Sequence, residues 1–477
     1  MKKLRLLVLL AAVLAVAAAC VYDYEGNGSL PALVEQQFES SIPLDFAEDI
    51  FAQMQALWDA DNGDLWGFSL HAPAMFACAI TRHVVANMPD PLGALTRHGD
   101  VYVGLLPDDI FAGNTIVDWN GLTWGMGSWM YLGMNLEAGL MDEISILTLM
   151  VHEAFHALQE EKIVHGGIPE AFFDPSGEHV FDQSQGHINS SADARIAVIL
   201  EFNALMAALN SQGDERLQAI HDALAIRAWR RYLTPHGVMS ENFQEILEGL
   251  AVFTEILVFG TGQELLSRYA HWVTPGMGTQ LGGFPYFTGA IYALLLKEMG
   301  ANWRQGITFE TDLAALLQEH LGITTIAPIG QVDLNRYGYV EVAATERAWM
   351  EEFTRLSQAA EDFFNAPTVF LEGISDFASF TRTENFRVDD PSEYIVGLWH
   401  LIMYGEFSML SANWYLEING GLVRMQHFPV QGIHIELCDN IEISEDGRRA
   451  TAPTWTLEIT SGNYTIQRAQ DGGIVIN

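Results

Sequence analysis

Residues 142–159 read Asp-Glu-Ile-Ser-Ile-Leu-Thr-Leu-Met-Val-His-Glu-Ala-Phe-His-Ala-Leu-Gln. This stretch predicts a helix, in which residues i and i+4 project from one face. The two histidines, His152 and His156, have that spacing and are expected to bind one metal ion together. Glu153 follows the first histidine directly and is expected to reach the coordination position that remains open.

The first residues have the features of a secretory signal. A positively charged start and an apolar run precede Ala17-Ala18-Ala19-Cys20, an ending that resembles a bacterial lipobox although Leu is commoner at its first position. We expect a signal peptide over residues 1–19, a lipid on Cys20 and a tether over residues 20–45. This places the protein at a bacterial cell envelope, facing the periplasm or the exterior. An uncleaved anchor and an ordinary signal peptide are the alternatives.

The chain is strongly acidic, with a formal net charge of −38 that becomes −41 when the signal is removed. Such a surface repels nucleic acid and anionic lipid head groups, so nucleic acid is not an expected partner. Membrane contact is expected only through the lipid anchor, and the composition does not indicate an oligomeric state. Besides Cys20 the chain has only Cys78 and Cys438, which are too few for a thiolate zinc site and whose pairing is left open.

The order of apolar patterns predicts an α+β protein. A mainly helical catalytic domain is expected between an N-terminal antiparallel strand region and a C-terminal β-meander, with boundaries at 46–140, 141–380 and 381–477. Asn120-Gly121 lies between two strand-like segments and predicts a tight hairpin turn. Asn419-Gly420 predicts another turn in the C-terminal region.

The two histidines need a third protein ligand, because a catalytic zinc site normally has three and an open water position. The residues after His156 lack the Gly and His of the metzincin motif. Two glutamates further along qualify, Glu201 and Glu248, each within an apolar predicted helix. Arg195 is the only other charge near Glu201 in its helix, and a buried carboxylate there needs a metal or an arginine as partner.

The segment around Glu248 resembles the second zinc motif of the gluzincin metallopeptidases. Glu248-Gly249-Leu250-Ala251, followed by Glu255, is similar to the Asn-Glu-Gly-Phe-Ala helix of the aminopeptidase N branch of the peptidase-MA clan. The resemblance implies a zincin-like fold, Glu248 as third ligand, and a Gly249 that lets its helix pack close to the metal helix. The spacing of 92 positions from His156 far exceeds that of the aminopeptidases. Glu201 therefore stays an alternative ligand, or else orients a histidine or pairs with an arginine.

Two further segments bear on the resemblance. Tyr286 begins a Tyr-x-x-Gly pattern that is similar to the helix start of the same clan, where the tyrosine stabilises the oxyanion; Tyr292 is the alternative. The strand-like residues 124–130 stand where aminopeptidases carry a Gly-Ala-Met-Glu-Asn edge strand, and they are expected to accept an extended peptide by strand addition. They lack the Glu of that motif, so an aminopeptidase preference is not implied.

The resemblance implies a zinc-dependent metallopeptidase that acts on peptide or protein substrates at the cell envelope. Zn²⁺ would be held by His152, His156 and Glu248, with Glu153 as general base and Tyr286 as oxyanion donor. The alternatives are a catalytically inactive lipoprotein that serves as a binding or scaffold module, and a zinc hydrolase of non-peptide amides. An enzyme is favoured because both histidines, the base and a suitable third ligand are all present.

Overall fold

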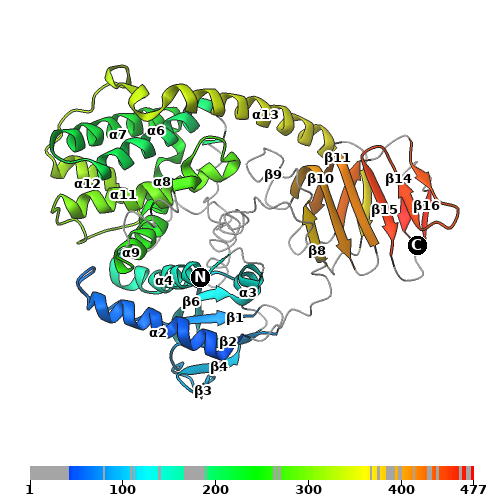
Figure 1. The fold of residues 1–477 in the computed structure, drawn as a ribbon, viewed down its shortest axis with the longest axis horizontal. Coiled ribbons are helices and arrows are strands. Elements are labelled where there is room, and N and C mark those ends of the chain that lie inside the picture. The colour runs from blue at the N-terminus through cyan, green and yellow to red at the C-terminus, as the bar shows by residue number, and fades with distance from the viewer. Residues whose placement is uncertain are drawn as a thin grey trace. The chain divides into compact units, whose positions relative to one another are not determined.

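The protein is described by a computed structural model (Figure 1), which covers residues 42–78, 81–107, 110, 113–137, 141–165, 188–189, 191–260, 266, 270–365, 368–372, 377–382, 393–395, 400–411, 414–426, 432–436, 440–460, 465–468 and 474–476. The predicted signal peptide, Cys20 and most of the tether lie outside these residues. The chain divides into two compact units: the first runs to Ala344 without Gly276–Thr279, and the second contains the remainder. The predicted α+β class is confirmed.

The first unit contains a six-stranded sheet in the order β3-β4-β2-β1-β6-β5. Its strands are β1 (Ala74–Ala77), β2 (His83–Ala86), β3 (Thr96–His98), β4 (Val101–Leu105), β5 (Thr115–Trp119) and β6 (Leu122–Ser128). The expected N-terminal strand region is therefore present. It is not wholly antiparallel, because β1 and β6 pair in parallel while the other neighbours pair antiparallel.

The turn between β5 and β6 confirms the predicted hairpin. Asn120 and Gly121 both have positive φ, 50° and 84°, as a two-residue turn that matches the strand twist requires. The expectation of a free edge at residues 124–130 is wrong. β6 is paired on both sides, with β1 and β5, and the chain becomes helical at Trp129. The outer strand on this side of the described sheet is β5.

Helices make up the rest of the first unit. They are α2 (Leu44–Asp61), α3 (Trp129–Glu137), α4 (Glu143–Leu158), α6 (Ala192–Asn210), α7 (Gly213–Leu233), α8 (Val238–Gln244), α9 (Leu250–Val258), α11 (Phe284–Glu298) and α12 (Leu313–His320), with 3₁₀ turns at Pro235–Gly237, His271–Val273, Gly278–Gly283, Ile329–Gln331 and Leu334–Tyr337. None of the helices in the described part of the chain is both long enough and apolar enough to span a membrane.

Two π-helical turns interrupt this helical region. Gln159–Ile163 follows α4 directly, and Glu245–Gly249, called the π turn below, joins α8 to α9. The single helix predicted around Glu248 is therefore two helices with a wider turn between them. Such turns are rare and are frequently found at functional sites.

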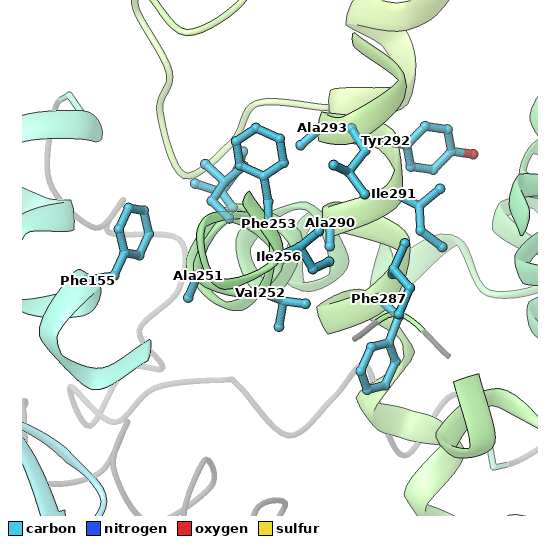
Figure 2. Close-up of a cluster of buried hydrophobic side chains, with 14 of the residues drawn as sticks. Phe155, Ala251, Val252, Phe253, Ile256, Phe287, Ala290, Ile291, Tyr292 and Ala293 are labelled. Carbon is cyan, nitrogen blue, oxygen red and sulfur yellow. The ribbon is translucent and has the colours of Figure 1, made fainter. Parts of the chain in front are cut away.

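The core of the first unit holds α4, α9 and α11 around common apolar side chains. Figure 2 shows Ile256 of α9 next to Ala290 of α11, and both are buried. The six-stranded sheet contacts α4, the helix that carries the HExxH motif, through Gly125 of β6. A Cβ at that position would lie 2.4 Å from the backbone carbonyl carbon of Glu153, so only glycine allows the strand to come this close.

A second close approach joins the π turn to α11. A Cβ on Gly249 would lie 2.8 Å from the Cα of Gly289, and a Cβ on Gly289 would lie 2.7 Å from the carbonyl oxygen of Glu245. Gly249 permits close packing, but the helix that it approaches through this face is α11. The expectation that this glycine brings its helix close to the helix of the HExxH motif is wrong for this contact.

The second unit is built mainly of antiparallel strands. Helix α13 (Tyr339–Asn365) leads into them, and the strands are β7 (Thr368–Glu372), β8 (Phe377–Arg382), β9 (Glu393–Ile395), β10 (His400–Ser411), β11 (Trp414–Gln426), β12 (Gly432–Glu436), β13 (Glu442–Ile443), β14 (Arg449–Thr451), β15 (Trp455–Ile459), β16 (Ile466–Arg468) and β17 (Ile474–Ile476). Strands thus begin before residue 381, where the β-rich region was expected to start. Nine of these strands form one sheet, in which six follow the order β13-β14-β15-β11-β10-β8. The other three lie off this order: β12 pairs with β11 and β7, and β9 pairs with β10. Strands β16 and β17 form a separate pair.

The expectation of a turn at Asn419-Gly420 is wrong. β11 passes through both residues without a break and pairs with β10 along its whole length. Gly405 stands opposite Gly421 and Glu406 stands opposite Asn419, so Gly420 is the extra residue of a β-bulge. Pairing with β10 on one side and with β12 and β15 on the other outweighs the local preference of Asn-Gly for a turn.

The glycine contact between the π turn and α11 yields a prediction. Gly289→Ala forces a methyl group against the Glu245 carbonyl, and overpacking of this kind costs about 1–3 kcal/mol. Gly283→Ala is the matched control, because a Cβ there meets no atom within 4 Å and its φ is −75°. Urea denaturation is expected to show destabilisation by Gly289→Ala and a change below about 0.5 kcal/mol for Gly283→Ala. Equal stabilities of the two variants would contradict the close contact.

Candidate metal centre

Three ligand atoms from two elements meet at one point. The Nε2 atoms of His152 and His156 lie 2.9 Å apart, and the Oε2 of Glu248 lies 3.1 Å and 3.3 Å from them. The histidines come from successive turns of α4, and the glutamate comes from the π turn. All three side chains are buried. The structure therefore brings together the three residues that were expected to hold a metal.

The second ring nitrogen of each histidine is already engaged. His152 Nδ1 donates to Glu255, whose carboxylate only accepts, and His156 Nδ1 lies 2.9 Å from Gln159 Oε1. Each Nδ1 therefore carries a proton, and each Nε2 presents its lone pair to the carboxylate of Glu248. Two unprotonated ring nitrogens and a carboxylate that face one another in a buried site repel unless a proton or a metal ion lies among them. The residues thus fit a tetrahedral zinc site with two nitrogens, one oxygen and one open position.

Gln159 is a residue of this site that the sequence interpretation missed. Its side-chain Nε2 donates to the carbonyl oxygens of Ile246 at 2.6 Å and Leu247 at 3.0 Å, both in the π turn. The available signal was its position three residues after His156, on the same helical face.

Electrostatics at the ligands follow from burial and from their mutual contacts. Burial alone would raise the pKa of Glu248, but His156 and His152 hold it well below its usual value. Burial would lower the pKa of His152, yet the carboxylates of Glu255 and Glu248 raise it well above the ordinary value. The group thus attracts positive charge strongly, as a cation site does.

Glu153 lies beside the ligands without being one of them. Burial raises its pKa to about 7, opposed by the neighbouring His152 and His156. A carboxyl with a pKa near neutrality is suited to accept and return a proton, and a positive ion nearby would favour its ionised form. The structure therefore leaves Glu153 free for the role of base that the motif predicts.

The two candidate tyrosines have separate locations. The ring of Tyr286 lies 6.4 Å from the ring of His152 and nearly parallel to it. Burial, together with the charge of Glu248 and a hydrogen bond to it, raises the pKa of Tyr286 well above its ordinary value, so its hydroxyl stays a donor. Tyr292 instead donates to Glu201 at 3.0 Å, and Figure 2 shows its hydroxyl directed away from α9. Only Tyr286 of this pair is at the metal site.

Glu201 is paired with arginines and is not at the metal site. Its carboxylate accepts from Arg227 at 3.1 Å and from Arg230 at 2.8 Å, in addition to Tyr292. All of these side chains are buried. The sequence left three roles for Glu201: metal ligand, partner of a histidine, or partner of an arginine. The structure has the arginine pairing.

One of these arginines, Arg227, also contacts the π turn that carries Glu248. Arg227 binds both carboxylate oxygens of Glu245, at 2.8 Å and 2.6 Å, and Thr288 Oγ1 donates to Glu245 at 2.7 Å. Further members of this network are Arg230, Glu201 and Glu241, which are buried, and Arg231 and Asp312, which are partly exposed. Since Glu245 is the first residue of the π turn, the network holds the turn that presents Glu248.

Comparison of the chain with protein-family models, with curated proteins and with solved structures returned no match. The resemblance to gluzincins accordingly rests on the three sequence motifs and on the geometry described above.

Proposed function

We propose that the protein is a zinc-dependent hydrolase of peptide bonds with a gluzincin-type site. The observation that carries the proposal is the convergence of two histidine Nε2 atoms and the Glu248 carboxylate, with both Nδ1 atoms already used as donors. This arrangement directs two ring nitrogens and a carboxylate at one buried point, where they can share a single positive charge. A divalent cation satisfies all three at once, and two imidazoles with one carboxylate are a ligand set that zinc enzymes use.

The proposed reaction assigns a role to each neighbouring side chain. When bound, zinc would make a water acidic and polarise the scissile carbonyl. Glu153 takes the proton of the attacking water and passes it to the leaving amine. Tyr286 donates its hydroxyl hydrogen bond to the oxygen on which negative charge develops.

The substrate side of the proposal follows from the sequence. The expected lipid on Cys20 would hold the enzyme at the cell envelope, where peptides or proteins outside the cytoplasm are the available substrates. The acidic chain argues against nucleic-acid substrates. A protein that binds zinc and yet cleaves neither peptides nor other amides would instead be a binding or scaffold module.

The ligand assignment is tested by metal content. Glu248→Ala is expected to lose zinc, because it removes the only carboxylate in contact with both histidines among the described residues. Glu201→Gln is the control: it keeps the size of the side chain and one acceptor oxygen inside the arginine network, and it is expected to retain about one zinc per chain. Elemental analysis of the purified proteins decides. Loss of zinc from the Glu201 variant alone would overturn the assignment.

The base is tested separately from the metal. Glu153→Gln preserves the size of the side chain and contributes no ligand, so zinc content is expected to stay at the wild-type level. Hydrolysis of a peptide library, followed by mass spectrometry, is expected to fall by about 10²–10⁴-fold. Full activity of this variant would exclude Glu153 as the base.

A pair of tyrosine variants tests the oxyanion donor. Tyr286→Phe is expected to lower kcat by about 10²–10³-fold while KM changes little, because the hydroxyl acts mainly in the transition state. Tyr292→Phe removes a hydroxyl from the arginine network and is expected to lower the thermal midpoint with kcat retained. The assignment fails if the two substitutions reduce kcat equally.

A further inference from the structure

The amide of Gln159 joins one expected metal ligand to the backbone that carries another. Its Oε1 lies 2.9 Å from His156 Nδ1, and its Nε2 donates to the carbonyl oxygens of Ile246 and Leu247. Leu247 directly precedes Glu248 in the π turn. The side chain is 1% exposed, so no solvent competes for these hydrogen bonds.

The two carbonyls determine which way the amide points. An amide turned by 180° would place its oxygen against both carbonyl oxygens and leave its NH₂ facing His156. The observed orientation gives Oε1 to His156, and an oxygen acceptor requires a proton on Nδ1. The lone pair of His156 is then on Nε2, the atom that faces Glu248. The backbone of the π turn thus selects, through Gln159, the tautomer of a histidine on another helix.

We infer that Gln159 is a positioning residue of the metal centre, which fixes the tautomer of His156 and the place of the π turn through one side chain. This inference rests on the proposed metal function. The two histidines are oriented by different partners: His152 Nδ1 donates to the carboxylate of Glu255, whereas His156 Nδ1 donates to the neutral amide of Gln159. Such supporting hydrogen bonds typically account for 10–100-fold in metal affinity.

The test compares zinc affinities of Gln159 variants in the full-length protein. Gln159→Leu removes both the acceptor for His156 and the donors for the two carbonyls. Gln159→Met does the same with a side chain of nearly the original length, and serves if the Leu variant does not fold. Both are expected to raise the zinc Kd by about 10–100-fold, measured by competition with a chromophoric chelator. The visible spectrum of the Co²⁺-substituted protein is expected to change as well.

Gln244→Leu is the matched control. Gln244 directly precedes the π turn, is also buried, and its Oε1 has no hydrogen-bond partner within the described structure. Its replacement is expected to leave the zinc Kd and the cobalt spectrum unchanged. Circular dichroism of the zinc-free proteins identifies a temperature at which every variant is folded, and the affinities are compared there.

Each remaining outcome has a distinct meaning. If the Gln159 variants are less stable without zinc but bind zinc as tightly as the wild type, the residue only joins two helices and the positioning role is overturned. If Gln244→Leu weakens zinc binding equally, any buried change near the π turn has this effect and the role is likewise overturned. If the wild-type protein binds neither zinc nor cobalt, the proposed function fails together with the inference.

Discussion

The site depends on one short segment, the π turn Glu245–Gly249, which is held from several directions. Gln159 donates to two of its carbonyls, Arg227 and Thr288 bind the Glu245 carboxylate, and Gly249 touches Gly289 of α11. Each contact restrains a different part of the same turn. The Glu248 carboxylate is thereby presented to two histidines that stand on another helix. A loosely held loop would place it less accurately, and metal sites lose affinity when ligands must be ordered on binding.

The buried arginine network illustrates how polar groups in a core contribute geometry more than stability. Taking three guanidinium groups and their carboxylates out of water costs several kcal/mol per ion, which close pairing only offsets. Arg227 nevertheless contacts Glu201 on α6 and Glu245 in the π turn. An apolar core would allow these helices to slide past one another, whereas bidentate ion pairs define one register. The network supports the turn that carries Glu248.

Local sequence patterns predicted the elements well and the contacts between them less well. The HExxH helix and the Asn120-Gly121 hairpin formed as expected, because i,i+4 spacing and positive φ are properties of a few neighbouring residues. Asn419-Gly420 has the same local preference, yet pairing of the flanking residues with β10 keeps it inside β11 as a bulge. Residues 124–130 were expected at a sheet edge, but their exposure depends on where β1 pairs, which no local pattern specifies.

The sequence by itself determined that His152 and His156 stand on one helical face, because that follows from helix periodicity alone. Tertiary structure decided the rest of the site. Glu201 and Glu248 both lie in segments that the sequence predicts as apolar helices, and only the packing of α6 against α7 shows that Glu201 is paired with arginines. Tyr286 and Tyr292 lie on one helix, and the direction of each side chain sends one to the metal site and the other to the network. These choices depend on residues many positions apart, whose distances are set by how the whole helical core packs.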